Sequence, residues 1–236
     1  MSVSMNKGHW SESVGVFDLE TTGIDVATSR IVSANVSLLD TDGNVVSRTD
    51  WLADPGVPIP EQAARVHGIT TEHARSLGRP AAEVVSEIVA ALREILATGA
   101  PIVIYNAPYD LSLLRHEALR HGVAPLDDPR PVIDPLVIDK AVDRYRKGKR
   151  TLDVVSAHYG VELRDAHEAA SDAVAAGRVA QAIARAYPQA LAIAADELHD
   201  MQIGWCEAQA LSFQTYMRTK RGRTDFVASG DWPVRV

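Results

Sequence analysis

Cysteine and long apolar runs are nearly missing from this sequence, and each shortage excludes a class of protein. The single cysteine, Cys206, excludes an intramolecular disulfide and is typical of a reducing compartment, where we expect a buried, inert thiol. No apolar run approaches the ~18 residues of a membrane-spanning helix, and residues 1–13 are polar without the apolar core of a signal peptide. We therefore expect a cytoplasmic protein with no membrane partner.

A surplus of basic residues is also missing. The net charge of −7 argues against a protein that coats nucleic acid without selectivity, because such proteins are usually basic. The same charge is compatible with an enzyme whose acidic residues gather at a metal site.

What is present predicts one α/β domain with an extension. The chain has 236 residues, 46% of them hydrophobic, which suffices for a core of ordinary size. Side-chain alternation and apolar runs predict strands over 14–20, 30–39, 45–52, 102–105 and 132–133. Helical spacing and turn residues predict helices over 61–66, 80–98, 107–121, 136–145, 152–159, 168–187 and 189–219. This order of elements favours a mixed sheet flanked by helices, with the segment after Pro188 as an appendage.

The first predicted strand carries two acidic residues, Asp18 and Glu20, and then breaks at a Thr-Thr-Gly turn. Alternate side chains of a strand point to the same face, so the two carboxylates lie side by side. Such a pair repels unless a proton or a cation lies between its members, and Mg²⁺ or Mn²⁺ prefers oxygen ligands of this kind. The alternative is a solvated strand end without a ligand.

Two later stretches add acidic residues and a histidine. Asp110 falls in the first turn of a helix that directly follows a core strand, and His167 precedes Asp172 by five residues. Positions five apart in a helix differ by about 140° in direction. His167 and Asp172 therefore converge only if His167 lies in an irregular lead-in and Asp172 in the helix proper.

Taken together, these segments resemble the three exonuclease motifs of the DEDDh 3′–5′ exonucleases. The similar stretches are Phe-Asp-Leu-Glu-Thr-Thr-Gly, Tyr-Asn-Ala-Pro-Tyr-Asp and His-x-Ala-x-x-Asp-Ala, in the order of that family. The epsilon proofreading subunit of bacterial DNA polymerase III and its stand-alone relatives are the most similar group. Two departures are Tyr105, where that group often has histidine, and the region after Pro188, which does not resemble the polymerase-binding tail of epsilon.

The resemblance covers residues 14–187 and implies a ribonuclease-H-like fold with a five-stranded mixed sheet. It divides the chain into a disordered segment 1–13, an exonuclease domain 14–187, and a helical extension and tail 188–236. Apolar residues recur through 189–219, so we expect the extension to pack on the domain or on a second copy.

The resemblance also implies a catalytic centre that uses two divalent cations, Mg²⁺ or Mn²⁺. The implied metal ligands are Asp18, Glu20, Asp110 and Asp172. His167 is the implied general base, a role that suits a side chain titrating near pH 6.5.

Residues that contact the substrate form a second set of expectations. The candidates for the terminal nucleotide are Thr21, Thr22, His67, Asn106 and Tyr109. The candidates for the nucleic-acid backbone are Arg146, Lys147, Lys149 and Arg150. The alternatives are turn chemistry for the threonines, a helix cap for Asn106, and a solvated loop for the cations.

The sequence thus predicts a metal-dependent 3′–5′ exonuclease that releases nucleoside 5′-monophosphates from single-stranded ends, with DNA favoured over RNA. The family resemblance makes DNA replication or repair, beside a polymerase or clamp, the expected setting. An RNA-trimming exonuclease of the same superfamily is the first alternative. A non-catalytic module that docks a polymerase is the second, and the five intact motif residues argue against it.

Overall fold

The computed structural model describes residues 9–163 and 167–235. It forms a mixed sheet with the strand order β4-β3-β2-β1-β5-β6. The strands are β1 (Val14–Thr21), β2 (Ile31–Leu39), β3 (Val45–Asp54), β4 (Arg79–Pro80), β5 (Ile102–Val103) and β6 (Val132–Ile133). β1, β2 and β3 pair antiparallel, whereas β5 runs parallel to β1, β6 parallel to β5, and β4 parallel to β3. The expected α/β fold is confirmed, and the two-residue β4 adds a sixth strand to the five that were predicted.

Nine helices lie in the described residues. They are α1 (Glu61–His67), α2 (Thr71–Leu77), α3 (Ala81–Thr98), α4 (Ala107–Arg120), α5 (Pro135–Val142), α6 (Leu152–His158), α7 (Ala169–Ala186), α8 (Pro188–Leu191) and α9 (Ala195–Lys220). Helix α2 was not predicted; Ala74 is its one buried residue, so its sequence shows no hydrophobic period. None of the described helices combines the length and apolar character that a membrane crossing requires.

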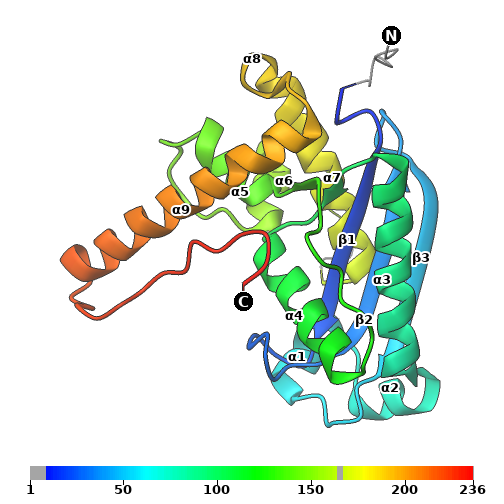
Figure 1. Ribbon diagram of the computed structural model, residues 1–236. Coiled ribbons are helices and arrows are strands. Elements are labelled where there is room, and N and C mark those ends of the chain that lie inside the picture. The colour runs from blue at the N-terminus through cyan, green and yellow to red at the C-terminus, as the bar shows by residue number, and fades with distance from the viewer. Residues whose placement is uncertain (1–8, 164–166, 236) are drawn as a thin grey trace.

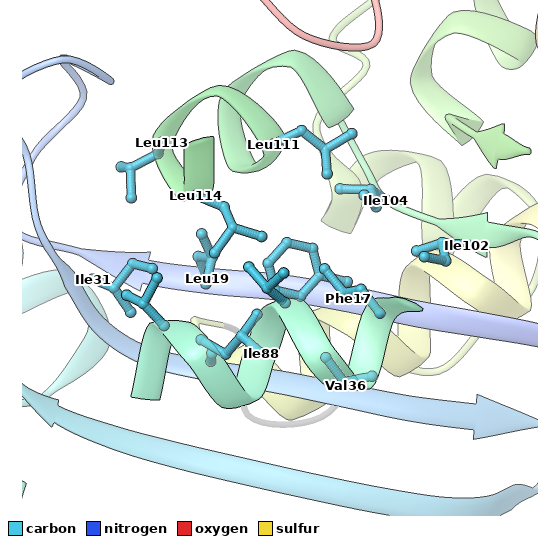
Figure 2. Close-up of a cluster of buried hydrophobic side chains, with 14 of the residues drawn as sticks. Phe17, Leu19, Ile31, Val36, Ile88, Ile102, Ile104, Leu111, Leu113 and Leu114 are labelled. Atoms are coloured by element: carbon cyan, nitrogen blue, oxygen red, sulfur yellow. The ribbon is translucent and has the colours of Figure 1, made fainter. Parts of the chain in front are cut away.

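The sheet is covered on both faces, as Figure 1 shows for α3 on one side and α7 on the other. Phe17 and Leu19 of β1 belong to a buried cluster with Ile88 of α3 and Leu114 of α4 (Figure 2). Because strand side chains alternate, the next positions of β1 face α7. On that face Val16 lies in a second buried cluster with alanines of α7. Asp18 and Glu20 therefore lie on the α7 side of β1.

Helix α7 approaches the sheet closely because its buried face is rich in alanine and includes Gly177. A Cβ atom added at Gly177 would lie 2.5 Å from Val16 Cγ1 and 2.6 Å from Leu39 Cδ1. Both neighbours are fully buried, and carbon atoms pack best at about 3.5–4.0 Å. Gly177 thus sets how near α7 lies to β1.

The C-terminal segment packs on this domain and covers one edge of the sheet. Helix α9 extends beyond the domain, and the C-terminal tail runs back along it toward α4 (Figure 1). The side chain of Gln202 accepts a hydrogen bond from the N–H of Asp134 at 2.6 Å and donates one to the carbonyl of Val132 at 3.0 Å. His199 Nδ1 accepts from the N–H of Val132 at 3.0 Å. Two buried side chains therefore take the place of a further strand beside β6.

The expected disorder of residues 1–13 does not hold for the described residues 9–13. Trp10 is buried, and its Nε1–H donates to the carbonyl of Leu191 in α8 at 3.0 Å. Residues 1–8 lie outside the described part of the chain. The limits proposed for the domain and the extension, 14–187 and 188–236, stay a prediction.

Candidate active site

Three of the predicted acidic residues come together between β1 and α7. Asp18 and Glu20, two positions apart on β1, and Asp172, in the first turn of α7, each offer a carboxylate oxygen. These oxygens all lie within 4.8 Å of one another. Period-two geometry places the first two on one face, and the close approach of α7 brings the third to them.

Crowding of negative charge makes these carboxylates harder to ionise. The pKa of Asp18 is raised well above its ordinary value, first by burial and then by the charges of Asp110, Glu20 and Asp172. Burial and the charge of Asp172 raise the pKa of Glu20 to about 8. Burial also raises the pKa of Asp172. Each of these shifts would be reversed by a cation among the oxygens.

The residues fit a divalent cation by a further criterion. Oδ1 of Asp172 is buried and has no hydrogen-bond partner among the described residues. A buried carboxylate oxygen without a donor is costly, and a cation satisfies it. Three converging carboxylates, one of them with an unsatisfied oxygen, are the donor set that Mg²⁺ and Mn²⁺ prefer.

Asp110 approaches the same strand from the other side. It lies in the first turn of α4 and is buried, and its Oδ1 accepts a hydrogen bond from the N–H of Leu19 at 3.2 Å. Leu19 lies past the end of the pairing between β1 and β5, which stops at Val16 and Val103. Burial raises the pKa of Asp110. The structure thus fixes the fourth acidic residue to the backbone between Asp18 and Glu20.

His167 meets the condition that its spacing from Asp172 imposed. It precedes α7, has a left-handed φ of 70°, and donates its backbone N–H to Asp172 Oδ2 at 3.3 Å. Its side chain is exposed, and its charge lowers the pKa of Asp172. The irregular backbone therefore brings a histidine beside the third carboxylate, where a regular helix would turn it away.

The family to which the chain belongs follows from a sequence match. The model of the exonuclease family, also designated RNase_T, matches residues 16–180. The chain belongs to the exonuclease family. The matched range includes every acidic residue described above and His167.

Relatives of this exonuclease-family chain include much longer DNA polymerase III proteins. The PolC-type DNA polymerase III of Lacticaseibacillus paracasei is 30% identical over 169 residues, 71% of this chain and 11% of the relative. The DNA polymerase III subunit epsilon-like protein of Rhodobacter capsulatus is 31% identical over 184 residues, 73% of this chain and 23% of the relative. The chain thus spans only a minor part of these curated relatives. The predicted resemblance to epsilon-like proteins is confirmed.

Solved structures confirm the predicted ribonuclease-H-like fold. E. coli exonuclease I in complex with a dT13 oligonucleotide matches with a TM-score of 0.65 and 20% identity, over 76% of this chain and 42% of that chain. The complex of exonuclease I with SSB-Ct matches with a TM-score of 0.63 and 20% identity, over 80% of this chain and 43% of that chain. At this identity the likeness shows the fold alone.

Three of the predicted nucleotide-contact residues of this exonuclease-family chain, Thr21, Thr22 and Tyr109, make contacts at the end of β1. The hydroxyl of Tyr109 donates to the carbonyl of Gly23 at 2.6 Å and lies 2.5 Å from Thr21 Oγ1. Thr22 Oγ1 accepts the N–H of Arg30 at 2.9 Å. Both threonines therefore shape the turn after β1, which is the alternative that the sequence left open.

His67, at the end of α1, lies in this neighbourhood. Its Nδ1 accepts the N–H of Ile69 at 3.1 Å, which leaves the proton on Nε2. Nε2 is buried and has no hydrogen-bond partner among the described residues. Burial lowers the pKa of His67, whereas the nearby backbone of Thr21 raises it in part. The ring therefore lies beside the end of β1, where it interacts with the backbone of Thr21.

Asn106 occupies the N-cap position of α4, but its side chain does not cap the helix. Its backbone is left-handed, with φ 64°, and its side chain is exposed. The carboxylate of Asp134 replaces it by accepting the N–H groups of Asn106 at 3.0 Å and Ala107 at 2.9 Å. The expected cap was wrong because the partner lies 28 residues further along the chain, where local sequence rules give no signal.

The four predicted backbone-binding cations divide into two kinds. Arg146 and Arg150 both pair with the fully buried Asp139, at 2.6 Å and 2.5 Å, and are themselves largely buried. Lys147 and Lys149 are exposed. The two arginines therefore anchor the loop, and contact of the four cations with the nucleic-acid backbone stays a prediction.

The loop that carries the lysines is linked by charge to Asp153, whose own charge reaches the carboxylate site. The negative charge of Asp153 contributes to the raised pKa of Asp172, after burial. A hydrogen bond with Thr151, backbone N–H groups and the charge of Lys149 lower the pKa of Asp153. Lys149 therefore acts within the electrostatic surroundings of the site.

Proposed function

We propose that this chain is a DEDDh-type, metal-dependent 3′–5′ exonuclease that releases nucleoside 5′-monophosphates from single-stranded ends. The observation that carries the proposal is the convergence of Asp18, Glu20 and Asp172 with an unsatisfied buried oxygen on Asp172. Two bound divalent cations, Mg²⁺ or Mn²⁺, would neutralise the scissile phosphate and lower the pKa of the attacking water.

The carboxylates have separate duties in this proposal. Asp18, Glu20 and Asp172 hold the cations directly, since their oxygens already converge. Asp110 joins them from α4, and its hydrogen bond to Leu19 fixes its height along β1. All four carboxyl groups have raised pKa values, so ionised carboxylates are unfavourable in the protein without a cation. Binding of a cation would remove this unfavourable charge.

His167 accepts the proton of the attacking water. Its exposed side chain can reach a substrate, and its backbone N–H is fixed by Asp172, a ligand of the site. A left-handed residue outside glycine is uncommon and is held here by the start of α7. The imidazole thus acts from a defined position beside the carboxylates.

The substrate end is assigned to the residues around the turn after β1. His67, which lies against the backbone of Thr21, is assigned to the terminal nucleotide together with Thr21, Thr22, Asn106 and Tyr109. Lys147 and Lys149 attract the phosphates upstream, since cation–phosphate contacts dominate the affinity for a single strand.

DNA is the favoured substrate. Two kinds of relative support this choice: DNA polymerase III proteins, and the exonuclease I whose structure holds a dT13 oligonucleotide. The family context also supports association with a polymerase as the setting of the activity.

End-labelled single-stranded DNA, duplex DNA and RNA, each incubated with Mg²⁺, Mn²⁺ or EDTA, provide the test. We expect mononucleotides from the 3′ end of single-stranded DNA with either metal, none with EDTA, and none from Asp18→Asn. Faster release of mononucleotides from RNA than from DNA would make RNA the favoured substrate. If no mononucleotide were released from any substrate, the chain would be a non-catalytic module, and the proposal would be overturned.

A further inference from the structure

Asp134 lies outside the carboxylate site, yet it connects the C-terminal segment to the helix that carries Asp110. It is fully buried at the junction between β6 and α5. Its Oδ1 accepts the N–H groups of Asn106 and Leu136, each at 3.0 Å. Its Oδ2 accepts the N–H of Ala107 at 2.9 Å and lies 3.4 Å from Nε1 of Trp232. One carboxylate thus caps two helices and contacts the tail.

The backbone of Asp134 is held from the opposite direction by α9. Its N–H donates to the side chain of Gln202 at 2.6 Å, and Gln202 also binds the carbonyl of Val132. Trp232 is buried and packs against His199 of α9, with ring centres 4.8 Å apart and ring planes tilted by 55°. The segment after Pro188 therefore fixes both the backbone and the carboxylate of Asp134.

Helix α4 depends on this carboxylate for its starting position. The side chain of Asn106 gives no cap, and the left-handed turn at that residue directs the first N–H groups of α4 to Asp134. Asp110 follows Ala107 by three residues, about one helical turn. A shift of the capped end is therefore transmitted to Asp110 and to its 3.2 Å bond with Leu19.

Charge links the two acidic residues as well. The negative charge of Asp134 is among the causes that raise the pKa of Asp110, behind burial. Asp134 itself is satisfied by its ring of N–H donors, whereas Asp110 accepts one strand N–H and its charge acts on Asp18.

We propose that Asp134 is a positioning residue for the cation site, and that the segment 188–236 belongs to the catalytic unit because Trp232 and Gln202 hold Asp134. The inference rests on the proposed function, since it assigns Asp110 to the cations. The chain of contacts runs from Trp232 and Gln202 to Asp134, then to the first turn of α4, and then to Asp110.

The test compares Asp134→Asn with Glu117→Gln in the full chain. Glu117 is the matched control because it is a fully buried acid of the same helix whose Oε2 accepts a strand N–H, that of Ile31, at 3.1 Å. In Asp134→Asn an amide NH₂ faces N–H donors, so α4 must shift. Mn²⁺ binding is measured by electron paramagnetic resonance of the free ion, and stability is measured by thermal unfolding in EDTA.

We expect Asp134→Asn to weaken Mn²⁺ binding about 10-fold, the lower end of what residues supporting metal ligands contribute. It should lower kcat and leave KM for a short oligonucleotide unchanged. Glu117→Gln should lose comparable thermal stability while binding Mn²⁺ like the wild type. If Asp134→Asn is destabilised but binds Mn²⁺ as the wild type does, the positioning role is refuted, and the proposed function stands.

A milder pair keeps the inference testable should Asp134→Asn fail to fold. Trp232→Phe removes the Nε1–H and retains the buried ring, and Trp51→Phe removes an equivalent N–H that donates to Glu87 at 2.8 Å. Loss of one hydrogen bond predicts about two- to tenfold weaker Mn²⁺ binding for Trp232→Phe, with none for Trp51→Phe. Equal Mn²⁺ affinity in both variants contradicts the inference. Absence of Mn²⁺ binding in the wild type overturns it together with the proposed function.

Discussion

Replacing Gly177 by alanine should destabilise this protein, although the same change stabilises most helices. A Cβ at this position of α7 would lie 2.5 Å from Val16 Cγ1 and 2.6 Å from Leu39 Cδ1. Since carbon atoms pack best at about 3.5–4.0 Å, the helix must move about 1 Å away from β1 or its neighbours must distort. Both neighbours are fully buried, so neither has free space to enter.

The magnitude follows from two opposing effects. Overpacking of a buried contact costs about 1–3 kcal/mol. Alanine gains about 0.5–1 kcal/mol over glycine in a helix interior. The net loss of unfolding free energy should therefore be about 0–2.5 kcal/mol, or up to about 10 °C in melting temperature for a chain of this size.

The same displacement should reach the cation site. Asp172 is carried by α7 and Asp18 by β1, and both depend on the close approach of these elements. A shift of about 1 Å in a reacting group can cost about 100-fold in rate. We therefore expect Gly177→Ala to lower both kcat and the Mn²⁺ affinity.

Gly204→Ala is the matched control. Gly204 lies inside α9, and a Cβ there would meet no heavy atom within 4 Å. This variant should be more stable than the wild type by about 0.5–1 kcal/mol in urea unfolding, with unchanged hydrolysis. If Gly177→Ala were stabilised to the same degree and bound Mn²⁺ normally, the close contact of α7 with β1 would be refuted.

Three further predictions concern the site itself. His167→Ala should lower the rate of hydrolysis about 10²–10⁴-fold while retaining metal-induced stabilisation, and a rate within threefold of wild type would exclude it as the base. In EDTA the melting temperature should fall as the pH rises from 4.5 toward 8. The raised pKa of Glu20 means that the folded state binds more protons than the unfolded state in this pH range. A melting temperature that rises across this pH range would contradict the crowding of negative charge around Glu20. Changing Lys147 and Lys149 together to alanine should flatten the slope of log affinity against log salt by roughly 1, since each single-strand phosphate contact contributes about −0.7. An unaltered slope would mean that this loop is only solvated.

The carboxylate pair was predictable from sequence because the period of a strand is local. Asp18 and Glu20 needed only their spacing and an apolar strand around them. For His167 the sequence predicted a condition: the residue had to lie outside the helix, since a spacing of five residues within one helix would have turned it away from Asp172. Structure supplied the strained backbone that meets this condition.

The cap on α4 and the anchoring of the cationic loop were not predictable in this way. Asp134 reaches α4, and Asp139 reaches Arg146 and Arg150, only after the helices and the sheet edge have packed. Sequence alone predicts that a charged loop is solvated, because it does not show that the buried Asp139 pairs with Arg146 and Arg150. The same limit explains why the packing of α9 on β6 was expected as burial of apolar surface but not as hydrogen bonding by Gln202 and His199.

The covering of β6 by α9 also restricts how this molecule can join a partner strand. An uncovered edge strand offers N–H and C=O groups to which another chain can add a strand. Gln202 and His199 already bind those groups at β6, so strand addition is blocked on that side. On the opposite side, β4 pairs only with Ala53 and Asp54, and residues 45–50 of β3 are exposed among the described strands. Pairing through the main chain is thus confined to one edge, where charged side chains interrupt the apolar ones and disfavour aggregation.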